Sequence, residues 1–114
     1  MVKKYHIKWT APAREDVNEI IDYISEKNLA FAVKALDKIE EEVNKLVTFP
    51  ERYRVVPELA KYGYVLYRNI IVDYWRVIYK IEKNFVYIML VVDSRRNLED
   101  LILKKILFRE KEML

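Results

Sequence analysis

Four arginines occupy positions from which their charge could act on a ligand. Arg68 and Arg76 lie within runs of apolar residues, and Arg95 and Arg96 interrupt the stretch VVDSRRNLEDL at residues 91–101. A guanidinium group is planar and permanently charged, so it can hold two oxygens of a phosphate or carboxylate at once. We therefore treat these four arginines as candidate target-binding residues.

The rest of the composition excludes most other chemistry. The chain has no cysteine, which removes disulfides, thiolate metal sites and cysteine nucleophiles. Gly63 is the sole glycine, so a glycine-rich phosphate loop is excluded, and neither Ser25 nor Ser94 lies in a nucleophile-elbow motif. The only histidine, His6, alternates with apolar neighbours and is typical of an ordinary strand residue. We expect no cofactor and no metal.

Length and composition favour one folded domain spanning residues 1–114. Hydrophobic residues make up 53% of the 114 residues and charged residues 34%, a balance typical of a globular chain. No apolar run approaches the roughly 20 residues that a membrane helix needs, and the N-terminal lysines are not followed by the apolar segment of a signal peptide. A cytoplasmic location, with no membrane partner, is the resulting expectation.

The first half of the chain has the pattern of a strand followed by two helices. Residues 4–9 alternate apolar and polar side chains, as a half-buried strand does. Thr10 is a suitable N-cap for a helix that continues to about Lys27, where Asn28 could end it in a left-handed conformation. A second apolar stripe predicts a helix over 29–47, and the short connection predicts an antiparallel hairpin.

The second half predicts an antiparallel meander and a last helix. Residues 48–63 contain two prolines and the glycine, and they form an irregular connection. Strands are then predicted at 64–71, 74–81 and 85–92, and a helix from Asn97 onward. The fold class is therefore α+β, consisting of an N-terminal strand, an antiparallel helix hairpin, a three-stranded antiparallel meander and a C-terminal helix.

Strand alternation suggests where two of the arginines point. An unpaired guanidinium is costly to bury, so Arg68 and Arg76 are expected to face an open side of the sheet, away from the helices. The structural alternative for Arg76 is a cross-strand ion pair with an acidic residue such as Asp73 or Glu82.

The double arginine precedes the last helix, where positive charge is unfavourable because the helix dipole is positive at that end. This position favours a functional role for Arg95 and Arg96, although ion pairs with Glu99 or Asp100 are the structural alternative. The helix itself carries more apolar residues than one buried face needs. A protein partner, or a homodimer through this C-terminal helix, would use the remainder.

Several stretches together resemble the ParE/RelE toxin superfamily, also described as plasmid-stabilisation toxins. They are IKWTAPAREDVNEIIDYI, FPERYRVVPEL, YRNI, YWRVIY and VVDSRRNLEDL, which occur in this order over most of the chain. The resemblance implies the toxin of a type II toxin–antitoxin pair, neutralised by a cognate antitoxin protein that is usually encoded beside it.

The resemblance leaves two activities open. RelE-like members cleave messenger RNA on the ribosome, and in that case Arg76 and Arg95 would match catalytic arginines. This chain has Leu101 near the place of the RelE tyrosine, and the strand of Arg68 has no lysine. ParE-like members inhibit DNA gyrase, and under this favoured interpretation the four arginines bind the target. The alternatives are a RelE-like endoribonuclease and a non-toxic relative that keeps only its partner binding.

Overall fold

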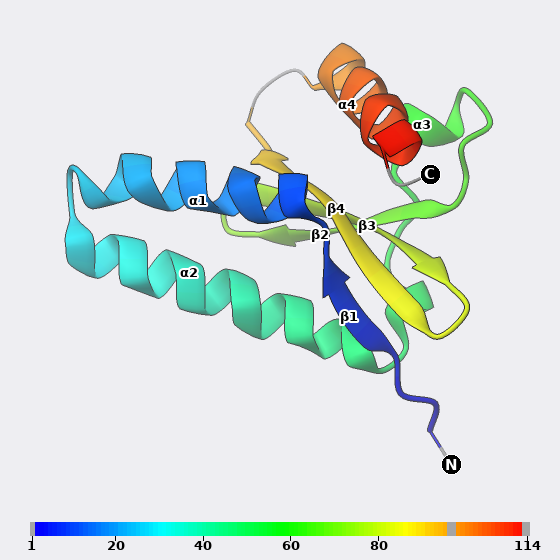
Figure 1. Ribbon diagram of the computed structural model, residues 1–114, viewed down its shortest axis with the longest axis horizontal. Coiled ribbons are helices and arrows are strands. Elements are labelled where there is room, and N and C mark those ends of the chain that lie inside the picture. The colour runs from blue at the N-terminus through cyan, green and yellow to red at the C-terminus, as the bar shows by residue number, and fades with distance from the viewer. Residues whose placement is uncertain (1, 96–97, 113–114) are drawn as a thin grey trace.

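The computed structural model describes residues 2–95 and 98–112 and arranges helices on both sides of a four-stranded sheet (Figure 1). The elements follow one another as β1 (His6–Trp9), α1 (Ala11–Ser25), α2 (Leu29–Asn44), the 3-10 helices η1 (Lys45–Val47) and η2 (Pro50–Arg52), α3 (Pro57–Ala60), β2 (Tyr67–Val72), β3 (Trp75–Glu82), β4 (Phe85–Asp93) and α4 (Glu99–Glu112). The predicted α+β fold class is therefore confirmed.

The strands are ordered β1-β4-β3-β2, so that the N-terminal strand lies at one edge of the sheet, beside the last strand. β2, β3 and β4 form the predicted antiparallel meander, and β1 runs parallel to β4. The register shifts between Ile78 and Tyr79, which leaves Met89 of β4 as an extra residue. Because of this bulge, Met89 and Leu90 both contribute to the core on the α4 side of the sheet.

Local capping explains how the helix hairpin begins. The Thr10 side chain accepts a hydrogen bond from the backbone N–H of Ala13, which caps α1 as predicted. Asn28 does not adopt the left-handed conformation expected for it. Its φ is −158°, and its side chain accepts a hydrogen bond of 3.0 Å from the N–H of Phe31, so it caps the start of α2. A single asparagine thus starts the second helix immediately after the first has ended.

The long connection after α2 is less irregular than its sequence suggests. It contains η1, η2 and α3, and it contributes the fully buried side chains of Val56 and Leu59. Its start is anchored by the Tyr79 hydroxyl, which donates a 2.6 Å hydrogen bond to the carbonyl of Pro50. The connection is therefore part of the packed structure.

Both faces of the sheet are packed. The helix hairpin covers one face, where its core includes Val17, Ile39, Val77 and Val86. The short α3 and the C-terminal α4 pack on the other face, whose core includes Ile78, Leu90, Ile102 and Ile106. The expectation of a sheet with one open face is therefore wrong where α3 and α4 lie, and the surplus of apolar residues in the last helix is partly used there.

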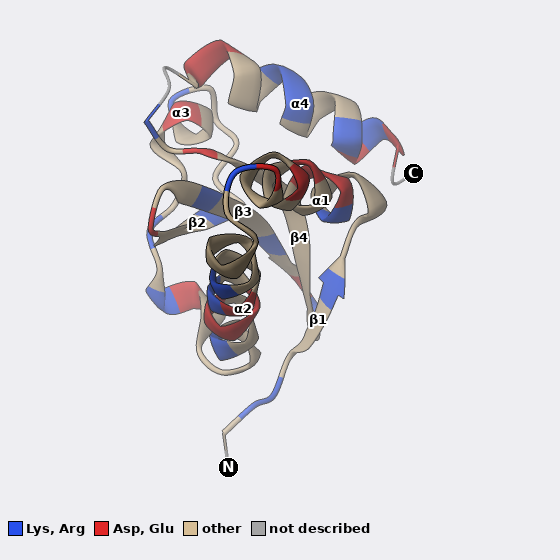
Figure 2. Cartoon of the chain, turned by 90° about the vertical axis from the view of Figure 1, so that its left-hand side faces the viewer, with Lys and Arg blue, Asp and Glu red and all other residues tan. Residues whose placement is uncertain are grey.

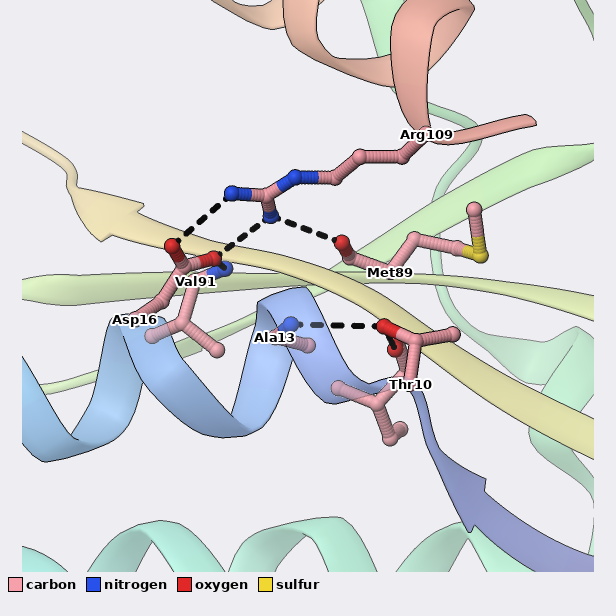
Figure 3. Close-up of polar contacts among 7 residues, drawn as sticks. Thr10, Ala13, Asp16, Met89, Val91 and Arg109 are labelled. Carbon is pink, nitrogen blue, oxygen red and sulfur yellow. Dashed lines mark hydrogen bonds and ion pairs between the residues drawn. The ribbon is translucent and has the colours of Figure 1, made fainter. Parts of the chain in front are cut away.

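Two charged side chains, one from each side of the sheet, bind backbone groups at the outer edge of β4. Pairing with β1 ends at Thr10, beyond which β4 has no neighbouring strand on that side. The N–H of Val91 donates to Asp16 of α1 at 3.0 Å, and Arg109 of α4 donates to the carbonyl of Met89 at 2.9 Å. Figure 3 shows that the same two side chains also bind each other, with N···O distances of 2.7 and 3.0 Å.

Replacing Arg109 with alanine should lower the free energy of unfolding by about 3 kcal/mol, because Asp16 would keep a largely buried charge without its cation. Urea denaturation followed by circular dichroism measures the loss. The control is Glu40→Ala, which removes an exposed 3.9 Å ion pair with Arg14 and should cost less than about 1 kcal/mol. Equal losses in the two variants would contradict a structural role for the Asp16–Arg109 pair.

Candidate functional site

Arg76 is held by partners inside the protein. Its guanidinium forms an ion pair with Glu58 of α3, with N···O distances of 2.6 and 3.0 Å, and donates to the Asn69 side chain at 2.6 Å. Its acidic partner is therefore Glu58, and the ion pair with Asp73 or Glu82 that the sequence offered as the structural alternative is not formed. Only 11% of the Arg76 side chain is exposed. The hydrogen bond from Arg76 lowers the pKa of the Glu58 carboxyl, which keeps the pair ionised at neutral pH.

Arg68 points to the other face of the sheet. In the β2–β3 register, Arg68 lies opposite Tyr79, whereas Arg76 lies opposite Ile71. The Arg68 guanidinium donates a 2.6 Å hydrogen bond to the carbonyl of Tyr53 and so holds the connection against β2. The expectation that Arg68 and Arg76 share an open face is therefore wrong. The alternation placed Arg68 on the face of Ile70, and that face is the one covered by the helix hairpin.

Lys80 forms a third internal network, which the sequence pattern did not reveal. Its amine contacts both carboxylate oxygens of Glu110, and Glu82 lies 3.3 Å away. The Tyr67 hydroxyl donates to the same Glu110 carboxylate. Burial alone would raise the pKa of Glu110, but the hydrogen bonds from Lys80 and Tyr67 outweigh it and lower that pKa. No local signal links Glu110 to these strands, because it lies on the last helix.

Arg95 is the candidate that remains at the surface. Its side chain is 64% exposed, and its guanidinium donates to both oxygens of Asp93 at 3.0 and 2.8 Å. The guanidinium also stacks over the ring of Tyr74, 4.5 Å from the ring centre. Asp93 is thus its partner in place of Glu99 or Asp100. Arg96 lies outside the described residues.

The turn that carries Tyr74 is fastened to the exit of β4. The backbone N–H and the hydroxyl of Ser94 both donate to the carbonyl of Tyr74, at 2.7 and 2.9 Å. The backbone just before Arg95 is therefore fixed. The Arg95 side chain is in turn held between the Asp93 carboxylate and the Tyr74 ring. Such a guanidinium is partly pre-organised, which lowers the entropy lost when it binds a partner.

A surface hollow of about 470 Å³ lies beside Arg95. It is bordered by the helix hairpin, the end of β4 and α4, and exposed aromatic rings surround it. The rings are those of Tyr23, Phe31 and Tyr74. Charges of both signs, including Glu19 and Lys105, also line it. A mixed aromatic and charged rim of this kind is typical of a protein-binding surface.

The described residues contain no cluster of histidine, cysteine, aspartate and glutamate that could hold a metal ion. No helix in the described ranges is long and apolar enough to cross a membrane. The ionic networks of Arg76 and Lys80 are largely buried, and their carboxylates are committed to cations. The geometry of the candidate residues thus supports binding better than proton transfer.

Comparison with known proteins decides the family. A sequence model of the ParE toxin of the type II toxin–antitoxin system parDE matches residues 7–98. The chain belongs to the ParE toxin family. No significant match was found among curated proteins.

Two solved structures resemble this ParE-family chain. The chromosomal ParDE toxin–antitoxin system from P. aeruginosa matches with a TM-score of 0.65 and 18% identity, over 79% of this chain and 96% of that one. The toxin–antitoxin complex RelBE2 from Mycobacterium tuberculosis matches with a TM-score of 0.53 and 20% identity, over 82% and 94% of the two chains. These likenesses confirm the fold that the sequence resemblance had implied.

Acid should weaken the attachment of α3 and α4. Because the pKa values of Glu58 and Glu110 are lowered by folding, their contribution to stability is complete above the unfolded pKa of about 4.3. It is lost as the pH falls through that value toward the folded pKa values. The double variant Glu58→Gln, Glu110→Gln should be less stable than the parent at pH 7 and should lose less further stability on acidification.

Urea midpoints measured across the acidic range test this expectation. Glu15→Gln, at an exposed position of α1, is the matched control and should leave the pH profile unchanged. If the double variant lost as much stability in acid as the parent does, the two ion pairs would not be the source of the acid sensitivity.

Proposed function

We propose that this ParE-family toxin acts by binding a protein target, DNA gyrase, through the surface around Arg95, and that a cognate antitoxin neutralises it. The observation that carries the proposal is the division among its arginines. Arg68 and Arg76 are engaged by internal acceptors, whereas Arg95 is exposed and held in place. Among the candidate arginines that the structure describes, Arg95 thus presents an oriented guanidinium, beside a hollow with an aromatic rim, that can contact a partner.

The same division argues against RelE-like cleavage of messenger RNA. A cleavage site needs cations that can reach the phosphate, together with a proton acceptor and a proton donor. Arg76 lies 2.6 Å from Glu58 and is mostly buried, so it could reach a phosphate only after that ion pair had opened. Arg96 is not described by the structure, and its assignment as a target-binding residue remains a prediction from the sequence.

The exposed end of α4 supports a second contact surface. Leu98, Ile102 and Ile106 are buried against the sheet, but Leu107 is 42% exposed and Phe108 is 63% exposed. The structural relatives include two toxin–antitoxin systems, which supports a cognate antitoxin as the partner. We infer that the antitoxin covers Leu107 and Phe108, since an apolar pair on a charged helix gains most from being buried by a partner. A homodimer through α4 would compete for this surface.

Replacing Arg95 with alanine should weaken inhibition of gyrase supercoiling by about tenfold or more, as expected for a central arginine at an interface. Tyr74→Ala should act in the same direction, because it removes the ring on which the guanidinium stacks. Arg52→Ala is the matched control, since Arg52 also stacks on a tyrosine, Tyr53, elsewhere on the surface. Wild-type protein that cleaves ribosome-bound messages but leaves supercoiling intact would refute the proposal.

Replacing Phe108 with glutamate should separate toxicity from neutralisation. The toxin should still arrest growth when induced, but the product of the neighbouring antitoxin frame should no longer rescue the cells, because a charge would replace the apolar contact. Val33→Glu, at an exposed apolar position of α2, is the control and should still be rescued. Full rescue of the Phe108 variant would exclude this helix end from the antitoxin interface. Light scattering of the purified toxin would show whether a homodimer uses it instead.

A further inference from the structure

The end of the sheet formed by β1 and the start of β4 carries aromatic and basic side chains that the toxin function does not use. In the parallel β1–β4 register, His6 lies opposite Phe85 and Lys8 lies opposite Tyr87. Their neighbours Ile7 and Val86 pack toward the helix hairpin, so these four side chains point to the other face. We call His6, Lys8, Phe85 and Tyr87 the aromatic–lysine platform.

The three rings of the platform form a continuous row. The ring centres of His6 and Phe85 are 5.6 Å apart, and those of Phe85 and Tyr87 are 5.8 Å apart, with interplanar angles of 41° and 34°. The Lys8 amine lies over the Phe85 ring, 5.4 Å from its centre. Phe85 and Tyr87 are partly exposed, and His6 and Lys8 are exposed, so the row is reachable from solvent. Figure 1 shows β1 and the β3–β4 turn extending away from α4.

Lysines cluster around the platform without matching acidic partners. Lys4 precedes β1, and Lys83 lies in the β3–β4 turn, which is held to β1 by a 2.8 Å hydrogen bond from the N–H of His6 to the carbonyl of Asn84. Lys4, Lys8 and Lys83 form no ion pair with any residue that the structure describes. Figure 2 shows this positive charge along β1 and the segment before it.

Two carboxylates lie near the platform, and one of them, Glu82, lies opposite Phe85 in the β3–β4 register. Glu82 and Glu110 both contact Lys80, which lies next to Tyr87 in the sheet register. The Lys80 amine is also 5.8 Å from the centre of the Tyr87 ring. The four lysines Lys4, Lys8, Lys80 and Lys83 therefore outnumber the two carboxylates, so the charge around the platform remains positive on balance.

We propose that the aromatic–lysine platform binds single-stranded nucleic acid. Exposed rings in a row on a sheet provide stacking surfaces for unpaired bases, and lysines beside them attract the phosphates that link those bases. A duplex would fit poorly, because its bases already stack on one another and are not available to the rings. The site is separate from Arg95 and Tyr74, so this binding is additional to the proposed inhibition of gyrase and does not depend on it.

Fluorescence anisotropy with labelled dodecamers of deoxythymidine and uridine, at low salt, tests the proposal on the full chain. Both oligonucleotides should bind, and Phe85→Leu should weaken binding by about tenfold, because stacking is lost while the apolar volume is kept. Lys8→Ala should reduce the slope of log affinity against log salt by about 0.7. The matched controls Tyr23→Ala and Lys34→Ala lie on the helix hairpin and should change neither quantity.

Three results would overturn the proposal. One is the absence of binding by either oligonucleotide at low salt. Another is unchanged affinity of a Phe85→Leu variant that circular dichroism shows to be folded. General charge attraction alone would then explain the binding of the oligonucleotides. The third is equal or tighter binding of a duplex, or of a poly-glutamate peptide, because either would mean that the rings do not recognise unpaired bases. An Arg95→Ala variant should bind the oligonucleotides normally, so failure of the gyrase proposal would leave this one intact.

Discussion

The unpaired outer edge of β4 is the constraint on which the arrangement of the helices depends. A strand with no neighbour on one side leaves backbone donors and acceptors there that must find partners when they are buried. Here Asp16 and Arg109 satisfy the N–H of Val91 and the carbonyl of Met89 while pairing with each other, and both side chains are only 12% exposed. The pair therefore connects a helix of the hairpin to the C-terminal helix across the sheet.

The bulge of β4 contributes to the same contact. Met89 is the extra residue of β4, and its carbonyl is the group that Arg109 binds. The bulge lets Met89 and Leu90 both pack toward α4 before the alternation resumes at Val91. The bulge thus provides both apolar side chains on which α4 packs and the backbone carbonyl that Arg109 binds near the end of α4.

Electrostatic pairing divides the basic residues into structural and accessible groups. Arg76 and Lys80 lie on the face that α3 and α4 cover, and each has a carboxylate from one of these helices. Buried pairs of this kind stabilise a particular arrangement mainly because breaking them leaves an unpaired charge. Arg95, Lys8 and Lys83 of the β3–β4 turn are among the basic residues that remain exposed. The division follows from which strand positions the two helices reach.

The sequence by itself determined the elements of this protein and its family. Periodicity and capping residues predicted β1, both hairpin helices, the meander and α4, because these signals are local. The predicted start of β2 at residue 64 was wrong, since residues 64–66 are apolar but precede the strand, which begins at Tyr67. The exit of β4 was also singled out from the sequence as a candidate site, because an arginine after a buried strand needs no distant partner to be recognised.

Only the tertiary structure decided what the charged residues do. Glu58 is 18 residues from Arg76, Glu110 is 30 from Lys80, and Asp16 is 93 from Arg109, so no local pattern could have paired them. The same distant contacts determine on which side of the sheet α4 packs. This packing covers a face of the sheet that was expected to be open. Residue types and spacing specify which groups are available, but the packing of helices on both faces determines which of them are neutralised and which remain accessible to a partner.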